Sequence, residues 1–154
     1  MKIKTLLVSL MPLYGLNTRF RILLYLREYT RNHHLKFFSC LIKNYILSKY
    51  SCELSIHAQI SPKAEFMHTT GVVIGEGAVI KEGVKIYSNV VLGRKDINNE
   101  DDYPIVNENV ILSTGTVVLG KVNISSGVVI GANSLVFKSL KKGTWVGAPA
   151  KQIL

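Results

Sequence analysis

Two ionisable side chains, His68 and Glu53, are the strongest candidates for chemistry in this sequence. His68 stands in the segment MHTTG (67–71), where a regular repeat is interrupted, and Glu53 directly precedes the first repeat. If 18 residues form one coil of the chain, as the repeat predicts, these side chains lie on adjacent coils near the same corner. The carboxylate would hold one imidazole nitrogen and leave the other free as a general base. A structural histidine and a solvated glutamate stay open as alternatives.

Other kinds of chemistry have little support in the sequence. His33 and His34 fall at a predicted helix junction, and His57 falls at a regular turn. No P-loop, nucleophile elbow or dinucleotide fingerprint is present. Two cysteines, Cys40 and Cys52, are too few for a disulfide framework and lack metal-site spacing. We therefore expect no bound metal and a reducing compartment.

A repeat of six residues must position the candidate groups. Three strands, one from each hexad, would close a coil, with Gly and Asn at the turns because they tolerate positive φ. A plain helix would repeat every three to four residues and a sandwich strand every two. A small or β-branched residue follows four positions after most of the starts. The thirteen apolar starting positions are Leu54, Ile60, Phe66, Ile74, Ile80, Ile86, Leu92, Val106, Leu112, Val118, Ile124, Ile130 and Val136.

Two gaps interrupt this period. Phe66 and Ile74 are eight residues apart, and Leu92 and Val106 are fourteen apart. The second gap contains the polar stretch GRKDINNEDDYPI (93–105), which we expect to leave the coil as a loop. Loops that leave a solenoid are commonly binding sites, although a tolerated insertion is the alternative.

Residues 1–52 form a separate basic segment, with nine Lys or Arg and one acidic residue. Residues 18–50 have helical spacing with a break at 31–34, and such helices would cap the exposed strand edges of a solenoid. This charge favours an anionic partner such as a membrane surface, and a solvated helical face is the alternative. Nucleic acid is not expected, because a recognised motif is missing. The run at 5–16 resembles a signal peptide only weakly, since no cleavage site follows, and we expect a cytoplasmic location.

Three segments together carry a family resemblance. HTTGVVIGEGAVI (68–80), YPIV (103–106) and VGAPAK (146–151) resemble the serine acetyltransferase branch of the left-handed β-helix acyltransferases. The resemblance covers about residues 53–154 and includes the length of the loop. It implies a mainly β fold, a left-handed parallel β-helix of hexapeptide repeats after a short N-terminal helical segment. It also implies a homotrimer that moves acetyl from acetyl-CoA, as co-substrate, to a hydroxyl, with no permanently bound cofactor.

The resemblance further implies a role for individual residues. His68 occupies the place of the catalytic base, and Glu53 occupies the place of its carboxylate partner, where the family usually has Asp. Positions expected to contact coenzyme A are Gly93, Thr114, Ala132 and Lys151. Positions expected to contact the acceptor are Met67, Asp102 and Tyr103.

Two departures from the family pattern favour a different acceptor. The family has Asp before its catalytic histidine and Arg-His-Pro at the end of the loop, whereas this chain has Met67 and Asp102-Tyr103-Pro104. An acidic side chain in place of an arginine would repel a carboxylate. We therefore predict acetylation of a sugar of a surface polysaccharide, with the basic segment at the inner face of the membrane. A serine O-acetyltransferase of cysteine biosynthesis and a non-catalytic scaffold are the alternatives.

Overall fold

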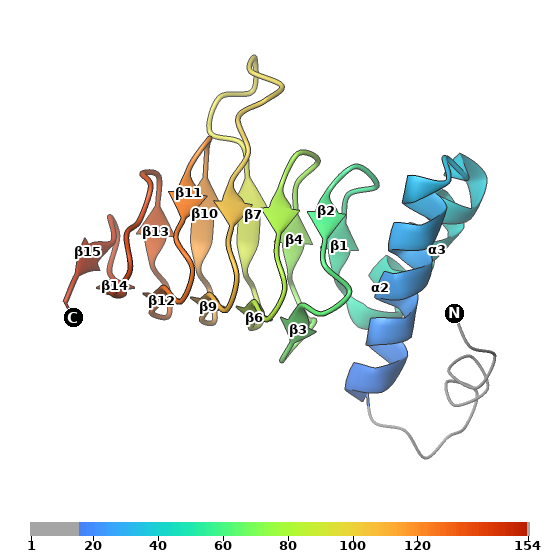
Figure 1. Cartoon of the computed structure of the whole chain (residues 1–154), viewed down its shortest axis with the longest axis horizontal. Coiled ribbons are helices and arrows are strands. Elements are labelled where there is room, and N and C mark those ends of the chain that lie inside the picture. Colours follow the sequence, from blue (N-terminus) through green and yellow to red (C-terminus); the bar gives the residue numbers. More distant parts are fainter. Residues whose placement is uncertain (1–15, 154) are drawn as a thin grey trace.

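The computed structural model describes residues 16–153, with side chains from residue 18 onward. The strands stack into a long three-sided prism, and two helices lie at one end of it (Figure 1). These helices are α2 (Leu16–Asn32) and α3 (Lys36–Tyr50), so the predicted helical stretch and its break are confirmed. The signal-peptide interpretation of residues 5–16 falls outside the described residues, apart from the last of them. Neither described helix has the length and hydropathy to cross a bilayer.

The strands are short because each side of the prism needs only a few residues between two corners. Their bounds are β1 Glu53–Leu54, β2 Gln59–Ile60, β3 Glu65–Phe66, β4 Val73–Ile74, β5 Val79–Ile80, β6 Lys85–Ile86, β7 Val91–Gly93, β8 Ile105–Val106, β9 Ile111–Leu112, β10 Val117–Leu119, β11 Asn123–Ile124, β12 Val129–Ile130, β13 Leu135–Val136, β14 Thr144–Val146 and β15 Lys151–Gln152.

Three sheets form the sides of the prism, because each strand pairs with a strand one coil away. We call them sheet A (β1-β4-β7-β10-β13), sheet B (β11-β8-β5-β2) and sheet C (β15-β14-β12-β9-β6-β3). Where the repeat is unbroken, one coil takes 18 residues, as between the paired residues Val73 and Val91. The described strand pairs are parallel except β14 with β15 at the C-terminal end, which are antiparallel. The predicted parallel β-helix is confirmed.

The interior of the prism consists of the predicted repeat positions. All thirteen apolar starting positions are buried, with exposed fractions between 0% and the 5% of Phe66. The positions four residues later are buried as well, including the polar Thr116 and Ser134, except after Phe66 and Leu92, where the repeat is interrupted. Burial of a large aliphatic side chain contributes roughly 1.5–3 kcal/mol relative to leaving it exposed. Stacking of like residues on like residues therefore holds successive coils together.

Helix α2 covers the open end of the first coil. The ring of Phe20 packs 5.1 Å from the ring of Tyr50 and 4.8 Å from that of Phe66, centroid to centroid. These contacts join α2, α3 and β3 into one apolar cluster. The exposed edge of the prism is thus closed by aromatic side chains, as expected for a solenoid cap.

Arg27 of α2 caps the polar groups of the same coil. Its guanidinium is almost fully buried, donates to the carbonyl oxygens of Ser55 and Ala58, and forms an ion pair with Glu28. Burial lowers the pKa of Arg27, and the charge of Glu28 opposes that shift. The first coil therefore has carbonyl groups satisfied by a side chain where no preceding coil exists.

The polar stretch predicted to leave the coil does so. It connects β7 of sheet A with β8 of sheet B and projects from the prism as the longest of its loops (Figure 1, yellow). The register continues undisturbed on either side, since Leu92 pairs with Val118 in the next coil. The insertion is therefore accommodated at one corner and leaves the stacked interior intact.

Candidate active site at the edges of sheet A

His68 lies in an irregular corner between β3 and β4. Glu53 pairs with Val73, twenty residues further on, whereas Val73 pairs with Val91, only eighteen residues further on. The two additional residues are accommodated in the corner that contains His68. The first predicted interruption of the repeat is therefore a local widening of the prism edge.

Hydrogen bonds to both neighbouring coils fix this corner. The amide of Gly71 donates to the carbonyl of Ser51 at 2.8 Å, and the amide of Asn89 donates to the carbonyl of Thr70 at 2.9 Å. Gly71 has a φ of 70°, and a side chain there would overlap the amide group of Asn89. The corner therefore has little freedom, and it presents the side chain of His68 to solvent.

Tyr87 is the aromatic neighbour of His68, and sequence reasoning missed it. The two ring centroids are 5.9 Å apart and the ring planes are tilted by 59°. Tyr87 follows Ile86 at the same corner one coil further on, and the amide of Met67 donates to the carbonyl of Ile86 at 2.8 Å. An aromatic residue directly after a repeat position, one coil beyond the interruption, is the signal that could have identified it.

Glu53 opens β1, and its side chain is exposed. His68 precedes β4, the strand that pairs with β1, so the two residues belong to neighbouring parts of one edge. Among residues 16–153, however, no hydrogen bond or ion pair connects the two side chains. Their pairing therefore stays a prediction.

Asp102 closes the base of the projecting loop. One carboxylate oxygen accepts hydrogen bonds from the amides of Lys95 and Asp96, both at 2.8 Å, and the other accepts from the amide of Lys121 at 2.6 Å. These bonds, with the Asp96 amide first among them, hold the pKa of Asp102 below its usual value. The side chain joins the two ends of the loop to the turn between β10 and β11.

Tyr103 anchors the same loop to the prism. Its side chain is buried, and its ring covers Gly75 and Gly77, where any side chain would overlap the ring. The guanidinium carbon of Arg94 lies 5.5 Å from the ring centroid on the loop side. Contact of Tyr103 and Asp102 with an acceptor stays a prediction, since both side chains have structural partners in the single chain.

Thr114 and Ala132 lie on the prism edge that carries His68. They are exposed in the corners after β9 and β12, and the amide of Asn133 donates to the carbonyl of Thr114 at 2.9 Å. Successive corners of this edge are thus connected by backbone hydrogen bonds. His68, Thr114 and Ala132 therefore lie along the same edge of the prism.

The other two predicted coenzyme A positions lie elsewhere. Gly93 ends β7 opposite Leu119, at the edge of sheet A from which the loop projects. Lys151 begins β15 at the C-terminal end, where it pairs with Val146 and its side chain is exposed. One chain therefore holds Gly93 at the opposite edge of sheet A from Thr114 and Ala132.

Between these two edges, the outer face of sheet A is apolar from β4 to β13, beyond the exposed Glu53 of β1. Val73, Val91, Val117 and Leu135 are consecutive partners in the register, and none of their side chains is buried. The matching outer column of sheet B includes the amide side chains of Gln59 and Asn123. An apolar strip of this kind on a surface is typical of a contact with another molecule.

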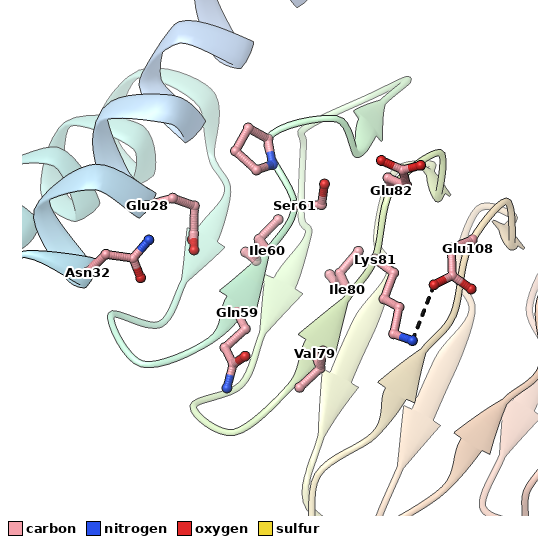
Figure 2. Close-up of a pocket in the computed structure, with 11 residues that line it drawn as sticks. Glu28, Asn32, Gln59, Ile60, Ser61, Val79, Ile80, Lys81, Glu82 and Glu108 are labelled. Atoms are coloured by element: carbon pink, nitrogen blue, oxygen red, sulfur yellow. Dashed lines mark ion pairs between the residues drawn. The ribbon is translucent and has the colours of Figure 1, made fainter. Parts of the chain in front are cut away.

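A hollow of about 430 Å³ lies on sheet B beside α2 and includes none of the predicted site residues. Figure 2 shows its lining side chains, with the ion pair between Lys81 and Glu108 dashed. Its three glutamates are paired in the folded chain: Glu28 with Arg31 at 2.8 Å, Glu82 with Lys63 at 2.8 Å, and Glu108 with Lys81 at 3.2 Å. The hollow therefore has no unpaired carboxylate to offer a ligand.

Neither a metal centre nor a reactive buried thiol is present in the described part of the chain. No three His, Cys, Asp or Glu side chains gather there as metal ligands. Cys52 is buried, and that burial raises the pKa of its thiol to about 12. The thiol therefore stays protonated at neutral pH and is a poor nucleophile.

Comparison with known proteins identifies relatives that share one name. No known family profile matches the chain. Over 117 residues it is 35% identical to the serine acetyltransferase of Buchnera aphidicola subsp. Schizaphis graminum, covering 75% of this chain and 45% of that protein. Over 106 residues it is 38% identical to the serine acetyltransferase of Staphylococcus aureus strain Mu50, covering 67% and 50%. The chain thus spans about half the length of these curated relatives.

Solved structures of serine acetyltransferases have the same fold. A truncated apoenzyme superposes with a TM-score of 0.82 at 28% identity, covering 92% of this chain and 59% of that one. A serine acetyltransferase in complex with CoA superposes with a TM-score of 0.75 at 30% identity, covering 82% and 52%. The Brucella abortus strain S19 protein in complex with coenzyme A gives 0.80 at 25% identity, covering 89% and 55%.

These relatives overturn the predicted acceptor. We predicted a sugar of a surface polysaccharide because Met67 and Asp102 replace serine-binding groups of the family. That prediction is wrong, since the relatives carry the name serine acetyltransferase. Asp102 was expected to repel the carboxylate of serine. Its own carboxylate is not a free charge, however, because three backbone amides donate hydrogen bonds to it. By sequence and by fold, the chain is similar to the left-handed β-helix, hexapeptide-repeat acyltransferases, and among them to serine acetyltransferases.

Proposed function

We propose that this chain transfers the acetyl group of acetyl-CoA to the side-chain hydroxyl of L-serine. The position of His68 carries the proposal, because an exposed imidazole occupies an irregular corner on the same edge as Thr114 and Ala132. The names of the relatives and the CoA bound to the solved structures support the same reaction. In this assignment acetyl-CoA is a co-substrate, and the chain needs no permanently bound cofactor.

The proposed reaction has one general base and no acyl-enzyme. A free imidazole nitrogen of His68 takes the hydroxyl proton while the oxygen attacks the thioester carbonyl, a contribution of roughly 10²–10⁴-fold. Backbone N–H groups would stabilise the negative oxygen of the tetrahedral intermediate. The intermediate then collapses as the C–S bond breaks, and the thiolate takes the proton back from the imidazolium. A thiol of pKa about 8.5 is a good leaving group and needs little further help.

The remaining site residues are assigned by position. Glu53 would orient the imidazole of His68 after a change of side-chain rotamer. Gly93, Thr114, Ala132 and Lys151 would border coenzyme A, and Met67, Asp102 and Tyr103 would border the acceptor. Support comes from their placement at the two edges of sheet A and at the C-terminal end of the prism.

We propose that the working form is a homotrimer. The apolar column of Val73, Val91, Val117 and Leu135 supports it, because its burial between copies would remove an apolar strip from water. Such an interface would bring the His68 edge of one copy towards the Gly93 edge of another. Residues that one chain holds apart would then border a single cleft.

One assay tests the reaction. Release of free thiol from acetyl-CoA is followed with L-serine, D-serine and a panel of sugars as acceptors. We expect turnover with L-serine and a loss of roughly 10²–10⁴-fold in kcat for His68→Ala, with His57→Ala as the matched control because His57 is an exposed histidine at a regular turn. Turnover with sugars alone would refute the acceptor. Unchanged turnover in His68→Ala would refute the base, and no turnover with any acceptor would favour a non-catalytic scaffold.

A cytoplasmic location with residues 1–52 against the inner membrane face is a further proposal. The outer side of α3 supports it, because Phe37, Phe38, Leu41 and Tyr45 are exposed there. Lysines at three positions of the same helix add positive charge: Lys36, Lys43 and Lys49. Exposed aromatic side chains beside basic ones are typical of helices that lie in the plane of a membrane surface.

A further inference from the structure

A small cavity lies beside the corner of His68, between α2 and β3. Its volume is about 200 Å³, and its lining residues are Phe20, Arg21, Glu65, Phe66 and Met67. Met67 directly precedes His68 in the irregular corner. The cavity therefore adjoins the proposed base and extends from it towards the helical cap.

Two side chains of this cavity carry opposite and unpaired charges. Arg21 on α2 and Glu65 on β3 are exposed, and neither side chain forms a hydrogen bond or ion pair with another described residue. The hollow on sheet B differs in this respect, since each of its three glutamates has a basic partner. A guanidinium and a carboxylate that lack internal partners are free to bind groups of a ligand.

The remainder of the cavity is apolar. Phe20 and Phe66 are nearly fully buried, and their ring centroids are 4.8 Å apart. A wall of this kind keeps water from one side of the charged groups, so their interactions with a ligand are stronger than in open solvent. The cavity is smaller than the roughly 300–1,000 Å³ clefts that hold drug-sized ligands. A single small molecule fits it, and a sugar chain does not.

We propose that this cavity is the subsite for the α-amino and α-carboxylate groups of the acceptor. The forked guanidinium of Arg21 would bind the carboxylate, since Arg is suited to bidentate carboxylate recognition. The carboxylate of Glu65 would bind the ammonium group, and Met67 would contact the side-chain methylene next to the hydroxyl. This inference rests on the proposed function and specifies its substrate as a zwitterionic amino acid. Arg21 of α2 and Glu65 of β3 would thereby supply the charges for binding the amino acid that Met67 and Asp102 do not provide.

Kinetics with truncated acceptors test the assignment of each charge. We expect Arg21→Gln and Glu65→Gln each to raise KM for L-serine by about tenfold or more, as the loss of a charge-assisted hydrogen bond predicts. Arg21→Gln should have little effect on serinamide, which lacks the carboxylate, and Glu65→Gln should have little effect on 3-hydroxypropanoate, which lacks the amine. Lys49→Gln, which removes the same charge from α3, should leave KM unchanged. An unchanged KM for L-serine, or an equal rise for every acceptor, would overturn the subsite.

Direct binding separates this inference from the proposed reaction. The sequence has three methionines, so methyl-labelled methionine gives few signals, and Met67→Leu identifies the one from the cavity. L-serine should shift the Met67 methyl signal in the wild type and fail to do so in Arg21→Gln. A shift without any thiol release would retain the subsite and refute the transferase. Thiol release with L-serine but no shift at saturating serine would refute the subsite and retain the transferase.

Discussion

The imidazole ring of His68 and the phenol ring of Tyr87 form a tilted pair, with centroids 5.9 Å apart. Tyr87 is half-buried, and its amide donates to the carbonyl of Leu112 at 3.1 Å, so its ring is attached to a fixed part of the next coil. His68 itself has no hydrogen-bonding side-chain partner among the described residues. The phenol ring therefore packs against the imidazole and restricts its orientations, and we propose Tyr87 as a positioning residue for the proposed base.

Replacing Tyr87 should separate the effect of its ring from that of its hydroxyl. An aromatic pair contributes roughly 0.5–1.5 kcal/mol beyond burial, so Tyr87→Leu should lower kcat about three- to tenfold. Tyr87→Phe should retain wild-type kcat because the ring remains. KM for acetyl-CoA and Tm should change little in either variant, as steady-state thiol release and thermal unfolding would show. Equal losses in both variants would mean that the hydroxyl, and not the ring, is the functional part.

The loop that ends in Tyr103 should depend on ionised Asp102. Backbone amides hold the pKa of Asp102 below its usual value, with the amide of Asp96 first among them, so protonation is harder in the folded chain. A group with a lowered pKa stabilises the folded state above its unfolded value of about 3.9, and that stabilisation is lost as pH falls through the lower folded value. The loop should thus stay closed near pH 4 and open only at more acidic pH.

Amide hydrogen exchange at Lys95, Asp96 and Lys121 measures that transition, since these amides donate to Asp102. Asp102→Asn should raise their exchange rates at pH values above the folded pKa of Asp102, and should have no further effect at more acidic pH, where the wild-type carboxyl is protonated. Asp101→Asn is the matched control, because it removes a neighbouring carboxylate that makes no such bonds. Protection that is equal in Asp102→Asn and the wild type would show that the loop is held by other contacts.

A charge on the outer face of sheet A should break the proposed trimer. Val117→Glu places a carboxylate in the middle of the apolar column, and an unpaired charge buried in an interface costs several kcal/mol. Light scattering after size exclusion should give a trimer for the wild type and a monomer for the variant, together with loss of transferase activity. Ile111→Glu makes the same change on sheet C and should remain trimeric. A trimeric Val117→Glu protein would place the interface elsewhere.

The outer side of α3 should bind anionic vesicles. Phe37 and Leu41 are 69% and 50% exposed, so the double variant Phe37→Ser with Leu41→Ser removes apolar contacts worth roughly 1.5–3 kcal/mol each when fully buried. Co-sedimentation with phosphatidylserine vesicles should fall at least tenfold and should weaken with salt in the wild type. Ile153→Ser changes an exposed apolar residue at the other end of the chain and should bind normally. Wild-type protein that stays in the supernatant would refute the membrane proposal.

Much of the architecture could be predicted because a local rule generates it. Each hexad buries its first residue, so the period itself revealed which side chains face inward, from Leu54 to Val136. The two breaks in the period located both the corner of His68 and the projecting loop, since neither insertion can remain in a regular coil. The acceptor prediction failed because it treated Asp102 as a free charge at the site.

The sequence alone determines the period of six, and with it the stacked coils and the irregular corner that contains His68. Which groups meet across the coils is decided only in three dimensions. Tyr87 reaches His68, three distant amides bind Asp102, and Arg21 shares a cavity with Glu65 because α2 closes the first coil. Such contacts join residues many positions apart through side-chain rotamers and helix packing, which follow no period, so the sequence offers at most a local cue such as the aromatic residue directly after Ile86.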